Sequence, residues 1–230
     1  MKSAGNDIVA LAKIDKHRTC QYRFYSKILS CSEEALYHQP QFTEFLFEKF
    51  VWLLWSVKES AYKFLKRNSK DLIFSPLRIV VQHIEIPSVF LTVKSNENYW
   101  TVTNDEKTVY KGKLTYNGHT LYFRSKVSEA WIASVVNGDD NFENVHWGIR
   151  SINDDRYDNQ SAKAREFLLN ELNLLFTGSL ITEKNPVGYI EIIRNNMPID
   201  IPVSISHDGM YVSYTFDLTC FHKMNNVRSA

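Results

Sequence analysis

Ionisable and aromatic side chains recur at helical spacing within residues 52–63, which read WLLWSVKESAYK. A rotation of about 100° per residue places four of them on one helix face: Trp52, Trp55, Glu59 and Lys63. A carboxylate between two indole rings needs a partner, which is either Lys63 or a metal ion. The alternative that the helix leaves open is an exposed ion pair between Glu59 and Lys63, worth roughly 0.2–0.5 kcal/mol.

A second candidate is an acidic residue near the start of the chain. Residues 5–9 read GNDIV, so Asp7 stands at the mouth of an apolar run. A strand that begins here would present Asp7 to a cleft at its end. A turn or capping aspartate is the alternative.

A third candidate is the segment at residues 203–212, VSISHDGMYV. An Asp-Gly pair between alternating runs is typical of a β-hairpin. The period of two puts Ser204 and Ser206 on one face and His207 on the other, beside the turn. His207 could hydrogen-bond an anion there, and a histidine that only faces solvent is the alternative.

Helices and strands are both needed to position these segments. Residues 40–67 give the strongest helical pattern, because Pro40 suits a first helical position and apolar residues follow one side. Ser30 and Glu33 have the spacing of a capping box, which predicts the start of a short helix. The other expected elements are a strand or helix at 7–14, an antiparallel meander at 77–136, a loop at 137–160, a helix at 161–176, a strand at 188–193 and a hairpin at 202–216. Strands of the meander are expected at 78–81, 89–93, 99–102, 113–116, 120–123 and 131–136.

Composition excludes several classes of function. The 230 residues are 44% hydrophobic and 23% charged, as in an ordinary soluble domain. The formal net charge of +1 gives no overall field that would attract nucleic acid or an anionic membrane. The 3 cysteines fit neither a disulfide framework nor a zinc site, which favours a reduced, cytoplasmic protein. We expect no signal peptide in residues 1–16 and no membrane span at residues 45–57, where charges interrupt the apolar run.

Taken together and in this order, the three segments resemble the 4'-phosphopantetheinyl transferase superfamily. The family pattern is Gly-x-Asp-Ile near the start, then Trp/Phe-x-x-Lys-Glu-Ser/Ala-x-x-Lys, and then a Ser-x-Ser-His hairpin. This sequence has the corresponding residues at 5–9, 55–63 and 204–207, with further similarity at 23–33 and 196–198. By motif, the resemblance covers the first ~70 and the last ~70 residues.

The resemblance implies an α+β fold in which an antiparallel sheet packs on a long central helix, as one unit or as two pseudo-symmetric lobes. The single unit would span residues 1–230. Divided, it would comprise an N-terminal segment with the long helix at 1–76, a β-rich insert or lobe at 77–140 and a C-terminal lobe with the hairpin at 141–230.

The resemblance also implies an activity. A cytoplasmic, Mg²⁺-dependent enzyme of the holo-acyl-carrier-protein synthase type would move 4'-phosphopantetheine from coenzyme A to a serine of an apo acyl or peptidyl carrier protein. Adenosine 3',5'-bisphosphate would be released. Fatty acid or polyketide biosynthesis is the implied setting.

Roles for single residues follow from the resemblance. Asp7 and Glu59 would hold Mg²⁺, with a third ligand left open because Val9 stands where the larger transferases carry a second acid. Glu59 and Lys63 would be the catalytic residues. The residues implied for coenzyme A binding are Lys58, Lys63, Ser206 and His207. An acidic carrier protein would dock on Arg23 and Lys27, and a basic stretch that is merely solvated is the alternative.

Two other functions stay open at this point. The chain could be a non-catalytic relative that binds carrier proteins or coenzyme A. It could also be an unrelated α+β module that recognises a partner by strand addition. Asp7 and Glu59 lying far apart in the structure would favour the unrelated module.

Overall fold

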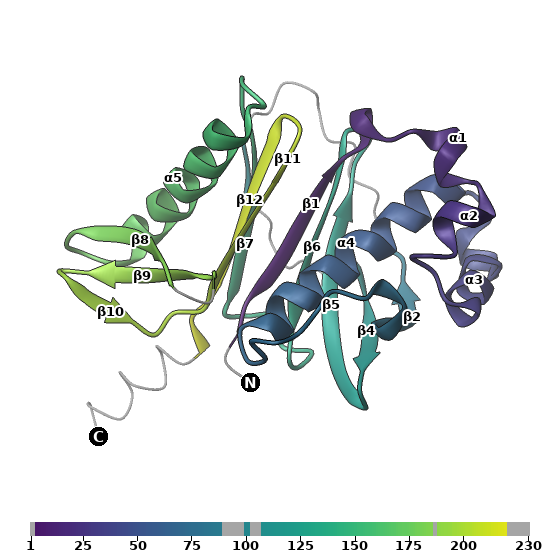
Figure 1. The fold of residues 1–230 in the computed structure, drawn as a ribbon, viewed down its shortest axis with the longest axis horizontal. Coiled ribbons are helices and arrows are strands. Elements are labelled where there is room, and N and C mark those ends of the chain that lie inside the picture. Colours follow the sequence, from purple (N-terminus) through teal and green to yellow (C-terminus); the bar gives the residue numbers. More distant parts are fainter. Residues whose placement is uncertain (1–2, 89–98, 102–106, 186–187, 220–230) are drawn as a thin grey trace.

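Two antiparallel sheets stand beside each other in the computed structural model, and a long helix packs on each (Figure 1). The structure describes residues 3–88, 99–101, 107–185 and 188–219. The mixed α+β architecture with antiparallel strands agrees with the expected fold class. The expected strand at 89–93 lies outside the described residues.

The first sheet has the strand order β1-β6-β5-β4-β2. Its strands are β1 (Gly5–Ala10), β2 (Val80–Glu85), β4 (Tyr110–Tyr116), β5 (His119–Val127) and β6 (Trp131–Asn137). The β4–β5 connection is a two-residue turn in which Asn117 and Gly118 have φ values of 47° and 79°. Such positive angles suit Asn-Gly and set the hairpin register. The expected meander therefore forms through β2, β4, β5 and β6.

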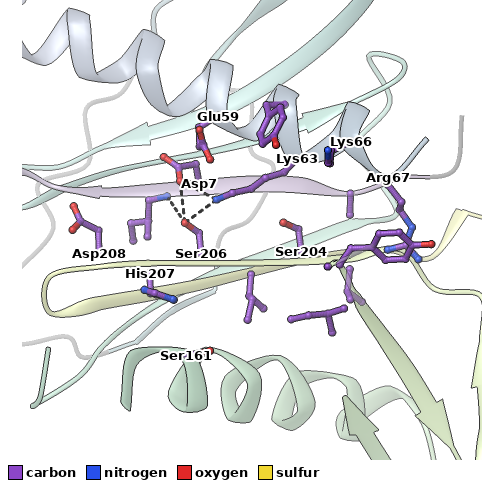
Figure 2. Close-up of a pocket in the computed structure, with 18 of the residues that line it drawn as sticks. Asp7, Glu59, Lys63, Lys66, Arg67, Ser161, Ser204, Ser206, His207 and Asp208 are labelled. Atoms are coloured by element: carbon purple, nitrogen blue, oxygen red, sulfur yellow. Dashed lines mark hydrogen bonds and ion pairs between the residues drawn. The ribbon is translucent and has the colours of Figure 1, made fainter. Parts of the chain in front are cut away.

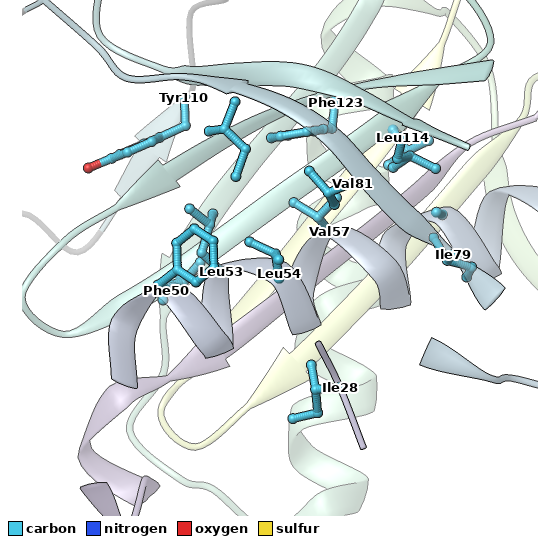
Figure 3. Close-up of a cluster of buried hydrophobic side chains, with 14 of the residues drawn as sticks. Ile28, Phe50, Leu53, Leu54, Val57, Ile79, Val81, Tyr110, Leu114 and Phe123 are labelled. Carbon is cyan, nitrogen blue, oxygen red and sulfur yellow. The ribbon is translucent and has the colours of Figure 1, made fainter. Parts of the chain in front are cut away.

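Helix α4 (Phe47–Lys66) lies across this sheet. One side of it is buried with the sheet in the main hydrophobic core (Figure 3), through residues that include Phe50, Leu53 and Val57. The expectation that this helix starts at Pro40 is wrong, because Pro40–Phe42 forms a separate 3₁₀ turn. The break lets the buried Phe42 ring pack edge-on against Phe50, with centroids 5.2 Å apart.

Three short helices precede α4: α1 (Lys16–Thr19), α2 (Tyr22–Tyr25) and α3 (Cys31–Tyr37). The capping box predicted at the start of α3 is confirmed. Ser30 Oγ accepts from the Glu33 backbone N–H, while the Glu33 carboxylate accepts from the Ser30 backbone N–H.

The second sheet has the order β11-β12-β7-β3, and helix α5 (Tyr157–Leu175) packs on it (Figure 1). Its strands are β3 (Tyr99–Thr101), β7 (Val145–Ser151), β11 (Val203–Asp208) and β12 (Tyr211–Asp217). A third, small sheet is formed by β8 (Leu180–Lys184), β9 (Ile190–Arg194) and β10 (Met197–Ile199).

Two expectations about this half of the chain are corrected. The segment 137–160 is not a loop, because it contains β7 and the first turn of α5. Polar flanks and Gly148 hide this strand in the sequence, yet Gly148 is required: a Cβ there would collide with the Tyr214 ring. Strand β3 is also not part of the meander, since it pairs with β7 in the second sheet.

The edges of the two large sheets meet along β1 and β11, at a junction that we call the seam (Figure 1). Side chains of β11, rather than its backbone, accept the outward-facing N–H groups of β1. The pairs are Asn6 N with Ser204 Oγ at 3.4 Å, Ile8 N with Ser206 Oγ at 3.3 Å and Ala10 N with Asp208 Oδ2 at 2.8 Å. The outward-facing N–H groups of the edge strand β1 are thereby hydrogen-bonded, although the two sheets do not join into one.

Among the described residues, none of the helices has the length and apolar character needed to cross a lipid bilayer.

Candidate active site

A cleft of about 700 Å³ follows the seam (Figure 2). It is lined by β1, the outer face of α4, all of β11, the start of α5 and the connection between β8 and β9. Residues from the beginning, the middle and the end of the chain therefore share one surface.

Close packing of β1 on α4 positions the first acidic residue. Gly5 makes this approach possible, because a Cβ at this position would overlap the Ser60 carbonyl oxygen. Two residues further along β1, the Asp7 side chain lies under α4 beside Glu59 and Lys63 (Figure 2). The segments that the sequence singled out as GNDIV and WSVKESAYK thus contribute to the same cleft.

The Lys63 ammonium lies at the centre of a hydrogen-bond network (Figure 2). Lys63 Nζ donates to Asn6 O at 3.0 Å, to Asp7 Oδ1 at 3.1 Å and to Ser206 Oγ at 3.2 Å. Ser206 Oγ donates in turn to Asp7 Oδ1 at 3.0 Å. Asp7 and Ser206 are each only 6% exposed, so these bonds are made away from bulk water.

Burial changes the ionisation of both acids in the cleft. It raises the pKa of Asp7 above the ordinary aspartate value, although Lys63 and the hydrogen bond from Ser206 oppose the change. Burial also raises the pKa of Glu59, with Lys63 lowering it and the nearby Asp7 charge raising it further. The electrostatic effect of Asp7 on Glu59 agrees with their place in the same cleft.

His207 lies in the same cleft on β11, with its ring 5.2 Å from the Tyr157 ring in an edge-on arrangement. Its pKa is lowered, first by burial and then by the positive charge of Lys63. A neutral imidazole keeps one N–H donor and one acceptor nitrogen, so His207 could still donate to an anion.

The two ends of the cleft differ in chemistry. Trp52 and Trp55 line one end, while Lys66 and Arg67 line the other, roughly 20 Å away along the helix axis. The Arg67 guanidinium lies over the Tyr189 ring at 4.7 Å, and its buried Nη1 makes no hydrogen bond in the described part of the chain. A buried donor without an acceptor is costly, which favours an anionic ligand at this end.

A magnesium ion fits the donors at the centre of the cleft. Asp7 and Glu59 both line it, and among the described residues no group of three or more His, Cys, Asp or Glu side chains forms a complete metal site. Mg²⁺ keeps several waters and is commonly bound by one or two carboxylates together with substrate phosphates. Asp7 and Glu59 are two carboxylates that line one cleft, so they are compatible with this kind of coordination.

Lys58 is not in the cleft, contrary to the expectation that it binds coenzyme A. Its side chain is 0% exposed and donates to Ile28 O at 2.5 Å and to Glu33 Oε2 at 2.7 Å. Glu33 Oε1 also accepts from the Val81 backbone N–H at 2.8 Å. The reason is helix geometry, since Lys58 points about 100° away from Glu59 and into the core.

The two residues predicted to dock a carrier protein, Arg23 and Lys27, are exposed and do not line the cleft. They lie on α2 and just after it. Trp52 Nε1 donates to Thr19 Oγ1 of α1 at 3.1 Å, which holds this helical segment next to the aromatic end of the cleft.

Sequence reasoning missed the contribution of Arg67 and Tyr189. Arg67 carried a signal, a basic residue at a helix end, but that pattern equally indicates a favourable charge near the helix dipole. Tyr189 carried no such signal, because only the folded chain brings this residue, which directly precedes β9, to the end of α4.

Comparison with known proteins identifies a family for the first half of the chain. Residues 3–121 match the family model of the 4'-phosphopantetheinyl transferase superfamily, which is more than half of the 230 residues. The matched range includes Asp7, Glu59 and Lys63 but not the β11 residues of the cleft. No curated protein and no solved structure matches the chain.

Proposed function

Because the chain belongs to the 4'-phosphopantetheinyl transferase superfamily, we propose that it transfers 4'-phosphopantetheine from coenzyme A to a serine of an apo acyl or peptidyl carrier protein. Membership implies phosphopantetheinyl transfer in general. The substrates, the metal and the residue roles given below belong to the proposal.

One observation gives the main support for this proposed function. The seam cleft gathers Asp7, Glu59 and Lys63 from the family-matched half with His207 from the opposite end of the chain. A buried acid, a partly buried acid, an ammonium and an imidazole in one cleft are suited to a substrate with several phosphates.

Coenzyme A suits the two unlike ends of the cleft. Its phosphates would lie toward Lys66 and Arg67, where the cleft has positive charge and an unused donor. His207 would hydrogen-bond a phosphate oxygen, and Lys63 would supply positive charge nearby. The uncharged pantetheine arm would extend toward Trp52 and Trp55, whose rings offer apolar surface.

In the transfer, the serine hydroxyl of the carrier protein attacks the phosphorus that bears pantetheine. A new P–O bond forms to the serine oxygen, and the bond from that phosphorus to the bridging oxygen of the pyrophosphate breaks. Adenosine 3',5'-bisphosphate leaves with the electron pair of the broken bond. The serine proton passes to the Glu59 carboxylate, directly or through a water.

Asp7 and Glu59 would hold Mg²⁺, which when bound would neutralise charge on the pyrophosphate. The remaining contribution of the protein to the reaction is to position the two substrates. Phosphoryl transfer depends mostly on orientation and electrostatics, so a few fixed charges in a partly dry cleft suffice.

The carrier protein would approach from the α1–α2 side. Carrier proteins of this kind are acidic, and Arg23 and Lys27 are exposed beside the aromatic end of the cleft, where the arm would emerge. The serine would then reach the phosphorus while the basic residues bind the acidic surface.

The test is incubation of the purified protein with coenzyme A, Mg²⁺ and several apo carrier proteins, followed by intact-protein mass spectrometry. We expect one carrier to gain a phosphopantetheine group. Glu59→Gln should reduce the rate by about 10²–10⁴-fold, as loss of a general base does. Glu44→Gln, an exposed glutamate outside the cleft, is the matched control and should keep full activity.

A wild-type protein that binds coenzyme A but modifies none of the carriers would instead support a non-catalytic relative. Full activity of Glu59→Gln would remove Glu59 from the mechanism.

A further inference from the structure

The hydroxyl of Ser206 has no capacity left for a ligand. A serine hydroxyl donates one hydrogen bond and accepts two. Ser206 Oγ donates to Asp7 Oδ1, and it accepts from Lys63 Nζ and from the Ile8 backbone N–H. All three positions are filled within the protein, and the residue is only 6% exposed.

Lys63 is similarly saturated. An ammonium has three N–H donors. Those of Lys63 point to Asn6 O, Asp7 Oδ1 and Ser206 Oγ, at 3.0 to 3.2 Å. Asp7, Lys63 and Ser206 thus form a closed ring of hydrogen bonds in which each member fixes the other two (Figure 2).

Ser204, two residues earlier on β11, is different. Its Oγ accepts one hydrogen bond, from the Asn6 backbone N–H at 3.4 Å, and its own proton has no acceptor in the described part of the chain. Ser204 lines the cleft and lies toward the Arg67 end (Figure 2). The Ser204 hydroxyl can therefore donate to a ligand in the part of the cleft that Lys66 and Arg67 line.

A phosphate oxygen can only accept from a serine hydroxyl. It could bind Ser206 only if the bond from Ser206 to Asp7 were broken, which would leave a buried carboxylate short of a donor. Ser204 can donate to a phosphate oxygen without breaking a hydrogen bond to a buried carboxylate.

We propose that the two hairpin serines have separate roles: Ser204 donates its hydroxyl proton to an anionic oxygen of the bound coenzyme A, whereas Ser206 is a positioning residue that orients Asp7 and Lys63. This inference rests on the proposed function. It replaces the expectation that Ser206 contacts the nucleotide phosphates.

The experiment is a crossed comparison of Ser204→Ala with Ser206→Ala, which remove the same group from neighbouring positions without changing charge. Coenzyme A binding is measured by calorimetry in EDTA, so that no metal contributes. Mn²⁺ binding is measured without coenzyme A by electron paramagnetic resonance.

We expect opposite effects from the two variants. Ser204→Ala should weaken coenzyme A binding by about tenfold or more, because a hydrogen bond to a charged group is lost, and it should leave Mn²⁺ binding within about twofold. Ser206→Ala should weaken Mn²⁺ binding by about tenfold or more, as the loss of a residue that orients a metal ligand does, and should leave coenzyme A binding in EDTA within about twofold.

Thermal unfolding without ligand checks that both variants fold. If Ser206→Ala is unstable, Ser206→Thr restores the hydroxyl and should restore Mn²⁺ binding. A Ser206→Ala variant that loses coenzyme A affinity and keeps Mn²⁺ affinity would overturn the assignment.

Failure of the inference can be told apart from failure of the proposed function. A wild-type protein that binds neither coenzyme A nor Mn²⁺ would contradict the proposed function itself. Binding of coenzyme A by the wild type without any binding of Mn²⁺ would contradict the metal site proposed at Asp7 and Glu59 together with the role given to Ser206, while the effect of Ser204→Ala on coenzyme A binding would still test the role of Ser204.

Discussion

At the residue scale, the cleft depends on acids that folding makes harder to ionise. Glu59 lies near the charges of Asp7 and Lys63, and burial is the main cause of its raised pKa. A carboxylate with a raised pKa is a better proton acceptor near neutral pH than an ordinary glutamate. Lys63 limits the effect, because without its charge the two acids would repel each other unopposed.

The pH dependence of the reaction should reflect this. Glu59 must be ionised to accept the serine proton, so activity should fall as the pH falls through its raised pKa. We expect the acid limb of the kcat/KM profile to lie above the ordinary glutamate pKa of 4.5. Steady-state rates with coenzyme A and one carrier protein between pH 4.5 and 8 measure the position of this acid limb. A kcat/KM profile that is flat across this range would contradict the role of Glu59.

A stability measurement separates this ionisation from catalysis. A group with a raised folded-state pKa stabilises the protein at low pH, and that stabilisation is lost as the pH rises through the folded-state pKa. The Glu59→Gln variant should therefore gain free energy of unfolding relative to the wild type as the pH rises. Urea unfolding at pH 4 and pH 7 tests the sign.

At the element scale, α4 is buried on one side and lines the cleft on another. Its buried side holds the ion pair of Lys58 and Glu33, both 0% exposed in their side chains. This pair ties α4 to α3, and through the Val81 N–H it reaches β2. A buried pair with all its partners present fixes the arrangement of the three elements, while loss of one partner leaves an uncompensated charge.

Lys58→Met should therefore lower the free energy of unfolding by about 3–5 kcal/mol, since it leaves the Glu33 charge buried. The double variant Lys58→Met with Glu33→Gln should lose less than the sum of the two single changes. Urea unfolding of all four proteins measures the coupling. Under conditions where Lys58→Met is folded, its affinity for coenzyme A should equal that of the wild type, and a selective loss of affinity would restore the original expectation for Lys58.

The helices α1 and α2 give the docking proposal its own test. Reversing both charges, as Arg23→Glu with Lys27→Glu, should raise the KM for an acidic carrier protein on the order of tenfold, because each exposed charge contributes about 1 kcal/mol or less. The KM for coenzyme A should not change. Lys113→Glu, an exposed charge on β4 outside the cleft, is the control. Equal effects of the three reversals would indicate a general charge effect and not a docking site.

At the scale of the whole molecule, the seam brings the site together. The family-matched range ends at residue 121, before β11, yet Ser206 holds Asp7 and His207 lines the cleft. The sheets do not divide cleanly at residue 140, because β3 crosses from the first part of the chain to the second sheet. Two lobes with internal symmetry remain a prediction.

A single chain supplies every residue of the proposed site. We therefore expect the active species to be a monomer. Light scattering during gel filtration should give the mass of one chain, and specific activity should not change on dilution. Activity that falls on dilution together with the dissociation of an oligomer would contradict this.

The sequence predicted the main elements well where pattern and local chemistry agree. The α3 capping box and the β11–β12 hairpin follow from short-range hydrogen bonding and backbone preference, and the structure has both. Strand β7 was missed because it is defined by its pairing with β12 and not by its own alternation.

For the candidate site, the sequence by itself determined which side chains were available: Asp7, Glu59, Lys63 and the hairpin residues from Ser204 to His207. It did not distinguish Lys58 from Lys63, or Ser204 from Ser206, because neighbouring residues of the same type have the same chemistry. Tertiary structure decided both choices. The packing of α4 turned Lys58 into the core, and the seam between β1 and β11 used all the hydrogen-bonding capacity of Ser206 while leaving the Ser204 hydroxyl without an acceptor among the described residues.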